Sequence, residues 1–367
     1  MMRVVVAVDS YKGSIGAAEA AAVIGAAWVG VRPDDEILLR PMADGGEGTL
    51  AAFELAVPGA RRMPLFVTGP AGTEVSADWL LLPDGTGVVE LASTSGIELL
   101  GERRLPFDAD TTGFGQAIAA ALAHGVERLV LGIGSSASTD GGVGLLRALG
   151  ARFLDIDGSE VASGLRGLTA IVKADLTDLR ALPPSGVVVL SDVTNPLLGE
   201  SGAAAVFGPQ KGLRPDDVML ADRSLAHLAT LLPANTGYRG AGAAGGSGFA
   251  LLAWGASLLP GAPEVADLIG LNDAIQVADL VITGEGSFDA QSARDKVPGF
   301  VAGAARRAGV PVALVAGRIG ADADLTGFVS TRSLTGLAGS PAAAMAEPGR
   351  WLTVATSALA ADLPAGN

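Results

Sequence analysis

The sequence contains no cysteine, which excludes disulfides, thiolate nucleophiles and thiolate metal sites. Only two histidines are present, His124 and His227, and so few imidazoles argue against a histidine-based zinc site. The longest apolar stretch, near residues 250–259, is too short to span a bilayer, and the N-terminus shows no signal-peptide pattern. We therefore expect a cytoplasmic protein that has no membrane partner.

Basic residues are scarce as well. The 25 lysines and arginines are outnumbered by 39 acidic residues, and a net charge of −14 argues against nucleic acid as a partner. Only four of the basic residues are lysines, and three of these, Lys12, Lys211 and Lys296, lie in short segments rich in small residues. Because lysine is a compact point charge that suits phosphate oxygens, these three are candidates for a polyanion site.

Glycine is abundant, with 52 residues, and its most informative cluster lies between an apolar run at 129–133 and a helical pattern from residue 143. A strand that leads through a glycine-rich turn into a helix N-terminus predicts an anion site. Ser135, Ser136, Ser138 and Thr139 would add hydroxyl donors, and the carboxylate of Asp140 suggests a bridging metal ion. The alternative is a simple connection whose small residues permit close packing.

The same stretch contains a partial dinucleotide fingerprint, Gly132-x-Gly134-x-x-Ala137. In that motif the helix starts within the glycine turn, whereas here polar and glycine residues separate the fingerprint from the helix. We therefore disfavour a dinucleotide site. A second glycine-rich segment, residues 240–248, is either a linker or a second backbone cradle, and we favour the cradle.

Strand and helix patterns alternate at both ends of the chain, which predicts an α/β fold with parallel sheets. Hairpin strands are expected in the middle, at residues 64–68, 74–82 and 87–91. We therefore predict a discontinuous domain, residues 1–62 plus 279–367, and an inserted α+β domain over residues 63–278. Helices are expected at 16–29, where Ser14 can act as the cap, at 49–56, 111–124, 216–231, 249–259, 298–307 and 351–361.

Isolated acidic residues follow several predicted strands. Asp9, Asp44 and Glu47 lie at such ends in the first sixty residues, and Asp192 follows the strand at 187–190. Ligands of parallel sheets bind at the carboxyl ends of the strands, although Asp9 and Asp44 could instead only cap turns. Phosphoryl transfer needs cations for phosphate, carboxylates for Mg²⁺ and one carboxylate to accept a proton, so the pattern favours a phosphate-handling enzyme.

Eight segments, in order along nearly the whole chain, resemble the bacterial glycerate kinase family. They are residues 6–14 (VAVDSYKGS), 43–49 (ADGGEGT), 132–142 (GIGSSASTDGG), 192–197 (DVTNPL), 207–211 (FGPQK), 242–246 (GAAGG), 283–286 (TGEG), and Asp289-x-Gln291 with 296–298 (KVP). The resemblance implies phosphorylation of D-glycerate by ATP with Mg²⁺, usually to 2-phosphoglycerate. It also implies that the discontinuous domain is flavodoxin-like (Rossmann-like) and that the active site lies between the two domains.

On this basis we expect Asp192 to be the general base, with Lys12 and Asp9 as further catalytic residues. Asp140 and Asp289 are expected metal ligands. The expected contacts to substrate and phosphate are Ser10, Ser14, Asp44, Gly45, Gly46, Glu47, Ser135, Ser136, Ser138, Thr139, Asn195, Lys211, Gly245, Gly246, Glu285, Gln291 and Lys296.

The chain departs from the family pattern at Ser135, Ser138 and Thr139, where hydroxyls can keep the donor role, and at Ser287, where a cation is frequent. The loss at Ser287 bears on substrate preference. Three alternatives stay open: a kinase of another small hydroxy acid, a dinucleotide-dependent oxidoreductase, and a non-catalytic protein that binds small acids. The sequence also leaves open the oligomeric state and which hydroxyl of glycerate is phosphorylated.

Overall fold

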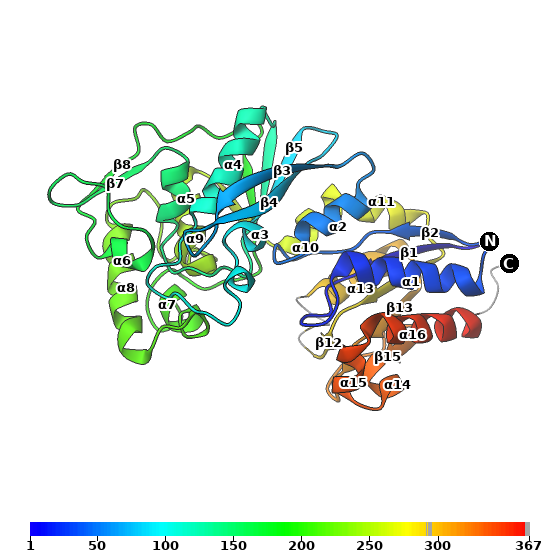
Figure 1. Cartoon of the computed structure of the whole chain (residues 1–367). Coiled ribbons are helices and arrows are strands. Elements are labelled where there is room, and N and C mark those ends of the chain that lie inside the picture. Colours follow the sequence, from blue (N-terminus) through cyan, green and yellow to red (C-terminus); the bar gives the residue numbers. More distant parts are fainter. Residues whose placement is uncertain (291, 293–295, 364–367) are drawn as a thin grey trace. The chain divides into compact units, whose positions relative to one another are not determined.

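The computed structural model describes residues 1–290, 292 and 296–363, so Gln291 lies outside the described residues. The chain forms two compact units (Figure 1). Unit 1 comprises residues 1–43, 51–58 and 262–367, and unit 2 comprises residues 44–50 and 59–261. These ranges differ from the predicted domains in three places: residues 44–50 and 59–62 belong to unit 2, and residues 262–278 belong to unit 1. The location of an active site between the domains stays a prediction.

Unit 1 is built on a parallel sheet of five strands in the order β15-β13-β11-β1-β2. The strands are β1 (Arg3–Val8), β2 (Glu36–Leu39), β11 (Leu280–Gly284), β13 (Val312–Ala316) and β15 (Ser330–Ser333). Short apolar runs form these strands, and those of β1, β11 and β13 are buried almost throughout. Counted within the unit, the order is 2-1-3-4-5, which reverses direction between β1 and β11. In doubly wound sheets ligands bind at such a reversal.

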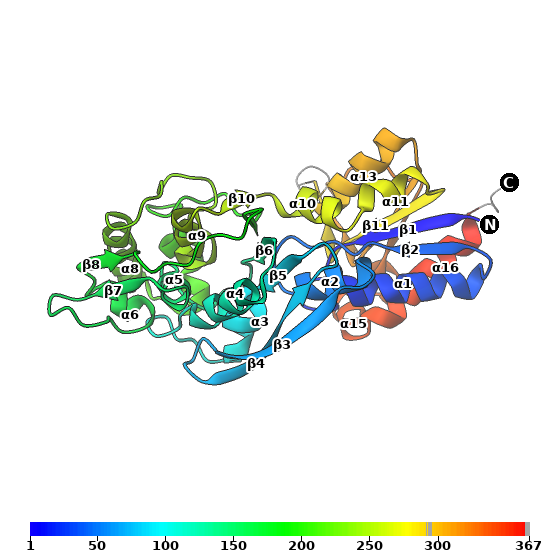
Figure 2. The same ribbon diagram turned by 90° about the horizontal axis from the view of Figure 1, so that it is seen from above.

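Helices cover both faces of this sheet. In Figure 2, α11 and α13 lie above the strands and α1 and α16 below them. The helices are α1 (Ala17–Val31), α2 (Thr49–Ala56, which begins in unit 2), α10 (Gly261–Leu268, which also begins there), α11 (Leu271–Gln276), α13 (Val297–Ala308), α14 (Leu334–Ala338), α15 (Pro341–Ala346) and α16 (Pro348–Asp362). A small parallel pair, β12 (Ser287–Phe288) and β14 (Arg318–Ile319), extends beyond β11 and β13.

Unit 2 has a mixed sheet in the order β10-β9-β6-β5-β4-β3. Its strands are β3 (Arg61–Thr68), β4 (Glu74–Leu81), β5 (Thr86–Glu90), β6 (Arg128–Gly132), β9 (Val187–Leu190) and β10 (Ser257–Leu259). The predicted hairpin strands are confirmed, because β3, β4 and β5 pair antiparallel. From β5 to β10 the pairing is parallel. The last residues of these four strands, Glu90, Gly132, Leu190 and Leu259, are therefore register partners in one row at the carboxyl edge.

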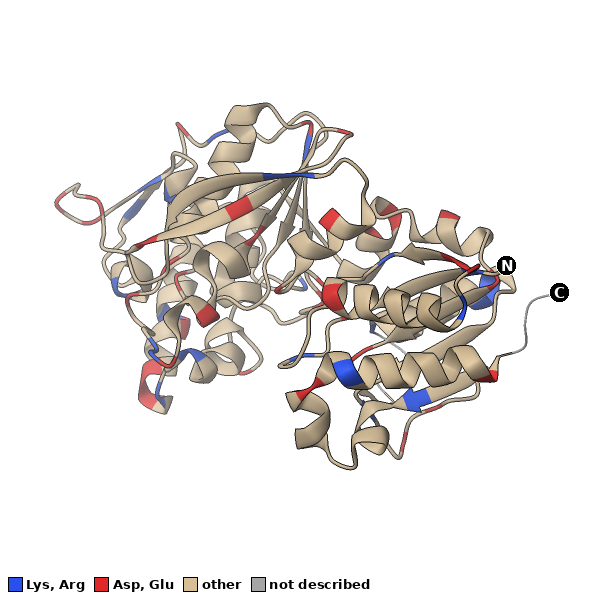
Figure 3. Cartoon of the chain, turned by 45° about the vertical axis from the view of Figure 1, so that its right-hand side comes forward, with Lys and Arg blue, Asp and Glu red and all other residues tan. Residues whose placement is uncertain are grey.

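The α-helices of unit 2 pack with this sheet around a continuous apolar core, and short 3₁₀-helices lie among them. They are α3 (Leu91–Ser95), η1 (Ile97–Leu100), α4 (Thr112–His124), α5 (Val143–Ala148), α6 (Gly164–Leu168), α7 (Ala203–Phe207), η2 (Pro209–Lys211), α8 (Pro215–Ala229), η3 (Ala243–Gly246) and α9 (Ser247–Trp254). A separate antiparallel pair consists of β7 (Arg152–Leu154) and β8 (Lys173–Asp175). Figure 3 shows acidic and basic residues interspersed over both units, so neither sign of charge is confined to one of them.

The mixed α/β fold with parallel sheets is confirmed, and most predicted helices and strands lie within a few residues of their observed positions. The helix expected at 249–259 is wrong in its second half. Gly255 adopts a left-handed φ of 103°, which ends α9 at Trp254, and the residues after it form β10. Ser14 does not cap the first helix, which begins after Gly16 without a side-chain cap.

Close helix packing in unit 2 depends on Gly115. A Cβ at this position of α4 would lie 2.5 Å from the backbone oxygen of Leu145 and 2.7 Å from the Cβ of Ala148 in α5. Alanine favours helix by about 1 kcal/mol over glycine, but a clash with backbone that cannot move costs more. We expect Gly115→Ala to lower the free energy of unfolding by about 1–3 kcal/mol in urea denaturation.

The matched control is Gly30→Ala in α1, where a Cβ would meet nothing within 4 Å. This change should be neutral or should raise stability by about 0.5–1 kcal/mol. Equal effects of the two substitutions would contradict the packing argument.

Candidate functional site

The segment between β6 and α5 folds around the side chain of Asp140, which is completely buried. Its Oδ2 accepts hydrogen bonds from the N–H of Thr111 (3.0 Å), the hydroxyl of Thr111 (2.8 Å) and the N–H of Gly144 (3.2 Å). Its Oδ1 accepts from the hydroxyl of Ser138 (3.0 Å) and the N–H of Gly142 (3.2 Å). Burial raises the pKa of Asp140, and the hydrogen bonds from Thr111 and Gly144 oppose that rise.

This geometry overturns the expected anion site at the start of α5. The N–H groups at this helix N-terminus were expected to face an external anion, but those of Gly142 and Gly144 donate to the carboxylate of Asp140. The anion at this helix terminus is thus the protein's own. A carboxylate offers about four lone-pair positions, and Asp140 already accepts five hydrogen bonds, so the expected metal ligation by Asp140 has no support here.

The hydroxyls of this segment are mostly internal. Ser136, Ser138 and Thr139 are buried, and the hydroxyl of Thr139 has no hydrogen-bond partner. Ser135 is exposed and adopts a φ of 57°, a left-handed conformation that is uncommon for a residue with a side chain. Of the four hydroxyls of this segment that were expected to contact substrate, Ser135 is the one that the structure leaves accessible.

Lys211, expected to bind phosphate, lies inside unit 2 with 2% of its surface exposed. Its Nζ donates to the hydroxyl of Ser136 at 2.7 Å and to the backbone oxygen of Ser138 at 2.5 Å. Burial lowers the pKa of Lys211 to about 7, and the negative charge of Asp140 opposes that shift. Lys211 therefore supports the β6–α5 segment from inside unit 2.

The second glycine-rich segment also supports the first. The N–H of Gly141 donates to the backbone oxygen of Gly245 at 3.0 Å. A Cβ at Gly245 would lie 2.1 Å from the backbone oxygen of Ser138, and one at Gly246 would lie 2.9 Å from the Cα of Gly141. Residues 240–248 are thus neither a linker nor an open cradle, because Gly245 and Gly246 are buried against the β6–α5 segment.

The space next to the two glycines of the dinucleotide fingerprint is also filled by main chain. A Cβ at Gly134 would lie 2.5 Å from the Cα of Gly46, and one at Gly132 would lie 2.7 Å from the backbone oxygen of Gly45. The N–H of Gly134 donates to that oxygen at 2.9 Å. The turn at residues 44–48 therefore fills the space that a pyrophosphate would need. This observation supports the prediction that the fingerprint is not a dinucleotide site.

Exposed carboxylates stand at the carboxyl edge of the unit 2 sheet. Asp192 follows β9 and accepts a hydrogen bond from the N–H of Gly261 at 2.8 Å. Partial burial raises the pKa of Asp192, the bond from Gly261 opposes the rise, and the charge of Asp44 adds to it. Asp44 and Glu47 are exposed on the 44–48 turn, and Asp44 also accepts the N–H of Gly46 at 2.9 Å, as the turn-capping alternative anticipated.

Asn195 lies a few residues beyond Asp192, and its side chain is already engaged. Its amide nitrogen donates to the backbone oxygen of Ser201 at 2.7 Å, and its own backbone oxygen accepts from Gly242. The amide thus holds the chain after β9 in place.

In unit 1 the expected residues gather at the sheet reversal. Asp9 follows β1, and its N–H donates to the backbone oxygen of Gly284 at the end of β11 (2.8 Å). Ser10 donates its N–H to the Asp9 carboxylate, and Lys12 is exposed. Tyr11, which sequence reasoning missed, is buried and donates its hydroxyl to the backbone oxygen of Val315 at 2.6 Å. The hydroxyl of Ser14 is 3.5 Å from the backbone oxygen of Met345.

Glu285 is the most notable carboxylate of unit 1. It follows β11, it is 6% exposed, and its Oε1 is a buried atom without a hydrogen-bond partner. Its Oε2 lies 3.8 Å from the Nζ of Lys296. Burial raises the pKa of Glu285, the Ser292 hydroxyl and Lys296 oppose the rise, and the charge of Asp289 adds to it. Asp289 accepts the N–H and the hydroxyl of Ser292.

These carboxylates suit a cation that arrives with its own ligands. Within the described residues, no group of three or more acidic or histidine side chains could enclose a metal ion. Mg²⁺ is commonly held by only one or two carboxylates together with substrate phosphates and water. Asp9 and Glu285 both raise the pKa of Tyr11, so both lie near its hydroxyl, although burial is the larger cause. The Oε1 of Glu285, which has no hydrogen-bond partner, therefore fits a Mg²⁺ site in which the protein carboxylates and the phosphates of a substrate share the ion.

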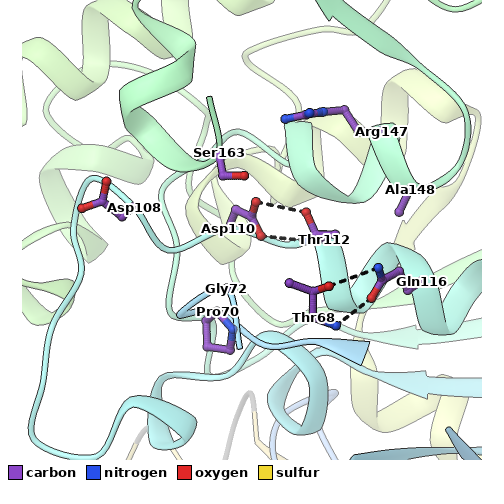
Figure 4. Close-up of a pocket in the computed structure, with 10 residues that line it drawn as sticks. All are labelled: Thr68, Pro70, Gly72, Asp108, Asp110, Thr112, Gln116, Arg147, Ala148 and Ser163. Atoms are coloured by element: carbon purple, nitrogen blue, oxygen red, sulfur yellow. Dashed lines mark hydrogen bonds between the residues drawn. The ribbon is translucent and has the colours of Figure 1, made fainter. Parts of the chain in front are cut away.

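Unit 2 also contains a cavity of about 490 Å³ that includes none of the expected site residues (Figure 4). Thr68 and Gln116 are joined by two hydrogen bonds on one side of it. Asp110 accepts the N–H and the hydroxyl of Thr112 at 3.0 Å each, and Arg147 lies at the opposite rim. The charge of Asp110 contributes to the raised pKa of Asp140.

Comparison with known proteins defines the class. The sequence model of the glycerate kinase family matches residues 4–363. The chain is 41% identical to the glycerate kinase of Bacillus subtilis over 88% of this chain and 87% of the relative. It is 40% identical to the glycerate 2-kinase of Escherichia coli K12, with coverage of 87% and 86%. The crystal structure described as glycerate kinase 2 from Salmonella typhimurium LT2 superposes with a TM-score of 0.85 at 38% identity, covering 98% and 97% of the two chains.

A kinase is therefore the class of enzyme that the fold and the relatives define. The chain belongs to the glycerate kinase family. Among the described residues, none of the helices has the length and apolar character that a bilayer crossing requires.

The lowered pKa of Lys211 can be tested through the pH dependence of the free energy of unfolding. Its pKa is about 7 in the folded protein against 10.5 for an ordinary lysine, so the unfolded chain binds more protons between these values. Stability must then rise with pH across this window through Lys211. The difference in unfolding free energy between the natural protein and Lys211→Met should grow by up to about 1.4 kcal/mol per unit from pH 7 to 9. Urea denaturation at several pH values measures it.

The control is Lys173→Met, which removes an exposed lysine from β8 in the same unit. Its stability should run parallel to that of the natural protein over the same pH range. If the Lys211→Met curve also runs parallel, the buried amine does not titrate as the structure indicates.

Proposed function

We propose that this kinase transfers the γ-phosphoryl group of ATP to a hydroxyl of D-glycerate and forms 2-phosphoglycerate. Family membership supports the reaction class, and the name of the Escherichia coli relative, glycerate 2-kinase, supports the 2-position. The single observation that carries the proposal is the carboxylate of Asp192, which is exposed at the end of β9 and has a raised pKa. A general base works best when its pKa approaches the working pH.

Asp192 would accept the proton of the attacking hydroxyl. Its Oδ1 is held by the N–H of Gly261, which fixes the side chain while Oδ2 stays available for the substrate. The charge of Asp44 disfavours a second anion nearby and so strengthens Asp192 as a base. Ser135 would donate its exposed hydroxyl to substrate or phosphate oxygens.

Unit 1 would bind the charged part of the nucleotide. Lys12 is exposed beside the sheet reversal, and Lys296 lies next to Glu285, so both can approach phosphate oxygens. Glu285 and Asp9 would hold Mg²⁺, which neutralises phosphate charge when bound. Asp289 beside Glu285 remains a further candidate ligand. The strand order of unit 1 supports the flavodoxin-like assignment, in which ligands bind at the reversal between β1 and β11.

A coupled assay of ADP release with Mg-ATP and D-glycerate tests the activity. We expect turnover with D-glycerate and little with L-glycerate, with glycerol or without acceptor. Phosphorus NMR of the product then identifies the phosphorylated hydroxyl. Binding of D-glycerate without ADP release would contradict the proposal and favour a non-catalytic acid-binding protein, and turnover only with another hydroxy acid would correct the substrate.

Asp192→Asn tests the base. Asparagine keeps an oxygen for the N–H of Gly261 but cannot accept the substrate proton, so we expect kcat to fall about 10²–10⁴-fold with the fold retained. The control Asp157→Asn removes an exposed carboxylate from a loop of the same unit and should leave kcat unchanged. Near-normal turnover of Asp192→Asn would reject Asp192 as the base.

A further inference from the structure

A buried glutamate that the sequence analysis did not select, Glu90, ends strand β5 with 5% of its surface exposed. Its Oε2 accepts the N–H of Leu50 at 3.0 Å, and its Oε1 accepts the N–H of Gly48 at 3.3 Å. These N–H groups belong to the first turn of α2 and the residue before it, where helical N–H groups have no partner within the helix. Glu90, at the end of β5, thus caps the beginning of α2, which still belongs to unit 2.

The turn that precedes α2 is anchored at its other end by main chain alone. The backbone oxygen of Gly45 accepts the N–H of Gly134 at 2.9 Å. A Cβ at Gly45 would lie 2.4 Å from the backbone oxygen of Leu190, the last residue of β9. The turn therefore rests on the ends of β6 and β9 through Gly45, and on the end of β5 through Glu90.

Between these two anchors the turn presents Asp44 and Glu47, both exposed. Two local hydrogen bonds stiffen it: the hydroxyl of Thr49 donates to the backbone oxygen of Gly46 at 2.7 Å, and the N–H of Gly46 donates to the Asp44 carboxylate at 2.9 Å. The two exposed carboxylates depend on the anchors for their position, because within the described residues neither forms a hydrogen bond or an ion pair with the sheet. Asp44 is close enough to Asp192 to raise its pKa, so the position of the turn bears directly on the proposed base.

The carboxylate form of Glu90 is used although burial disfavours it. Burial raises the pKa of Glu90, and the neighbouring charge of Glu47 raises it further, whereas the N–H groups of Leu50 and Gly48 oppose the rise. Each oxygen of Glu90 accepts one of the two N–H groups, and a carboxylate can accept at both oxygens at once. The charge also interacts favourably with the positive end of α2, a helix of eight residues.

We propose that Glu90 is a positioning residue for the reaction: it holds the 44–48 turn, and with it Asp44 and Glu47, at the carboxyl edge beside Asp192. This inference rests on the proposed function for its kinetic part only. Its structural part, the hydrogen bonds that Glu90 accepts from the N–H groups of Gly48 and Leu50, can be measured whatever substrate the enzyme phosphorylates.

The test is Glu90→Gln in the full chain, with Glu127→Gln as the control, since Glu127 is an exposed glutamate near the opposite end of the same sheet. Glutamine has the same shape but one acceptor oxygen, so one of the two N–H groups loses its partner. We expect kcat with D-glycerate to fall about 10- to 100-fold, with a smaller change in KM, because a small misplacement of reacting groups is costly. The melting temperature should change little, since a buried charge is also removed.

Hydrogen exchange supplies the second readout. The amides of Gly48 and Leu50 should exchange faster in Glu90→Gln than in the natural protein and in Glu127→Gln, while amides of the β6 and β9 interior keep their protection. If Glu90→Gln does not fold, Thr49→Val takes its place. It removes the bond to Gly46 from the same turn, and should lower kcat and speed exchange at the same amides.

Unchanged kcat in a folded Glu90→Gln protein, or unchanged exchange at Gly48 and Leu50, would overturn the positioning role. A loss of activity that only follows the loss of folded protein would show a purely structural residue and would equally overturn it. If the natural protein shows no turnover with glycerate, the proposed function fails, whereas faster exchange at Gly48 and Leu50 in the variant would still establish the hydrogen bonds that Glu90 accepts.

Discussion

The burial of the Asp140 carboxylate is the constraint on which the edge of unit 2 depends. A charged group without water must be surrounded by donors, and here the donors come from the start of α4, the start of α5 and the segment between β6 and α5. These three parts of the chain are therefore tied to one point. The buried amine of Lys211 donates to the same segment, so a carboxylate and an amine both hold it from within.

The second constraint is the direct approach of main chain to main chain. Gly45 lies against Leu190, Gly134 against Gly46, and Gly245 against Ser138, each at distances that a side chain would not permit. With the backbone packed so closely, few polar groups remain for ligands. In unit 2, Ser135, Asp44, Glu47 and Asp192 are the exposed ones among the residues expected to act, and the buried groups hold the segments that carry them.

Much of this architecture could be predicted from the sequence, because apolar runs and helical periodicity decide strands and helices locally. The strand ends that carry Asp9 and Asp192 followed from the same reasoning. The roles of Asp140 and Lys211 could not be predicted in this way. A glycine-rich turn with one acidic residue and a lysine elsewhere in the sequence has the same composition whether these charged groups bind a ligand or are buried inside the protein. Burial decides between the two, and burial depends on contacts between segments far apart in the chain. Glu90 was missed although it also ends a strand, because its apolar neighbours made it resemble an ordinary strand residue.

The contacts of Gly45, Gly134 and Gly245 with backbone atoms also restrict how the protein can evolve. When a larger side chain clashes with another side chain, a second substitution that shortens the neighbour can restore the fit. A clash with a carbonyl oxygen or a Cα has no such remedy, because every amino acid carries the same backbone. A genetic selection for suppressors of alanine at these positions should therefore return true revertants and very few compensating changes elsewhere.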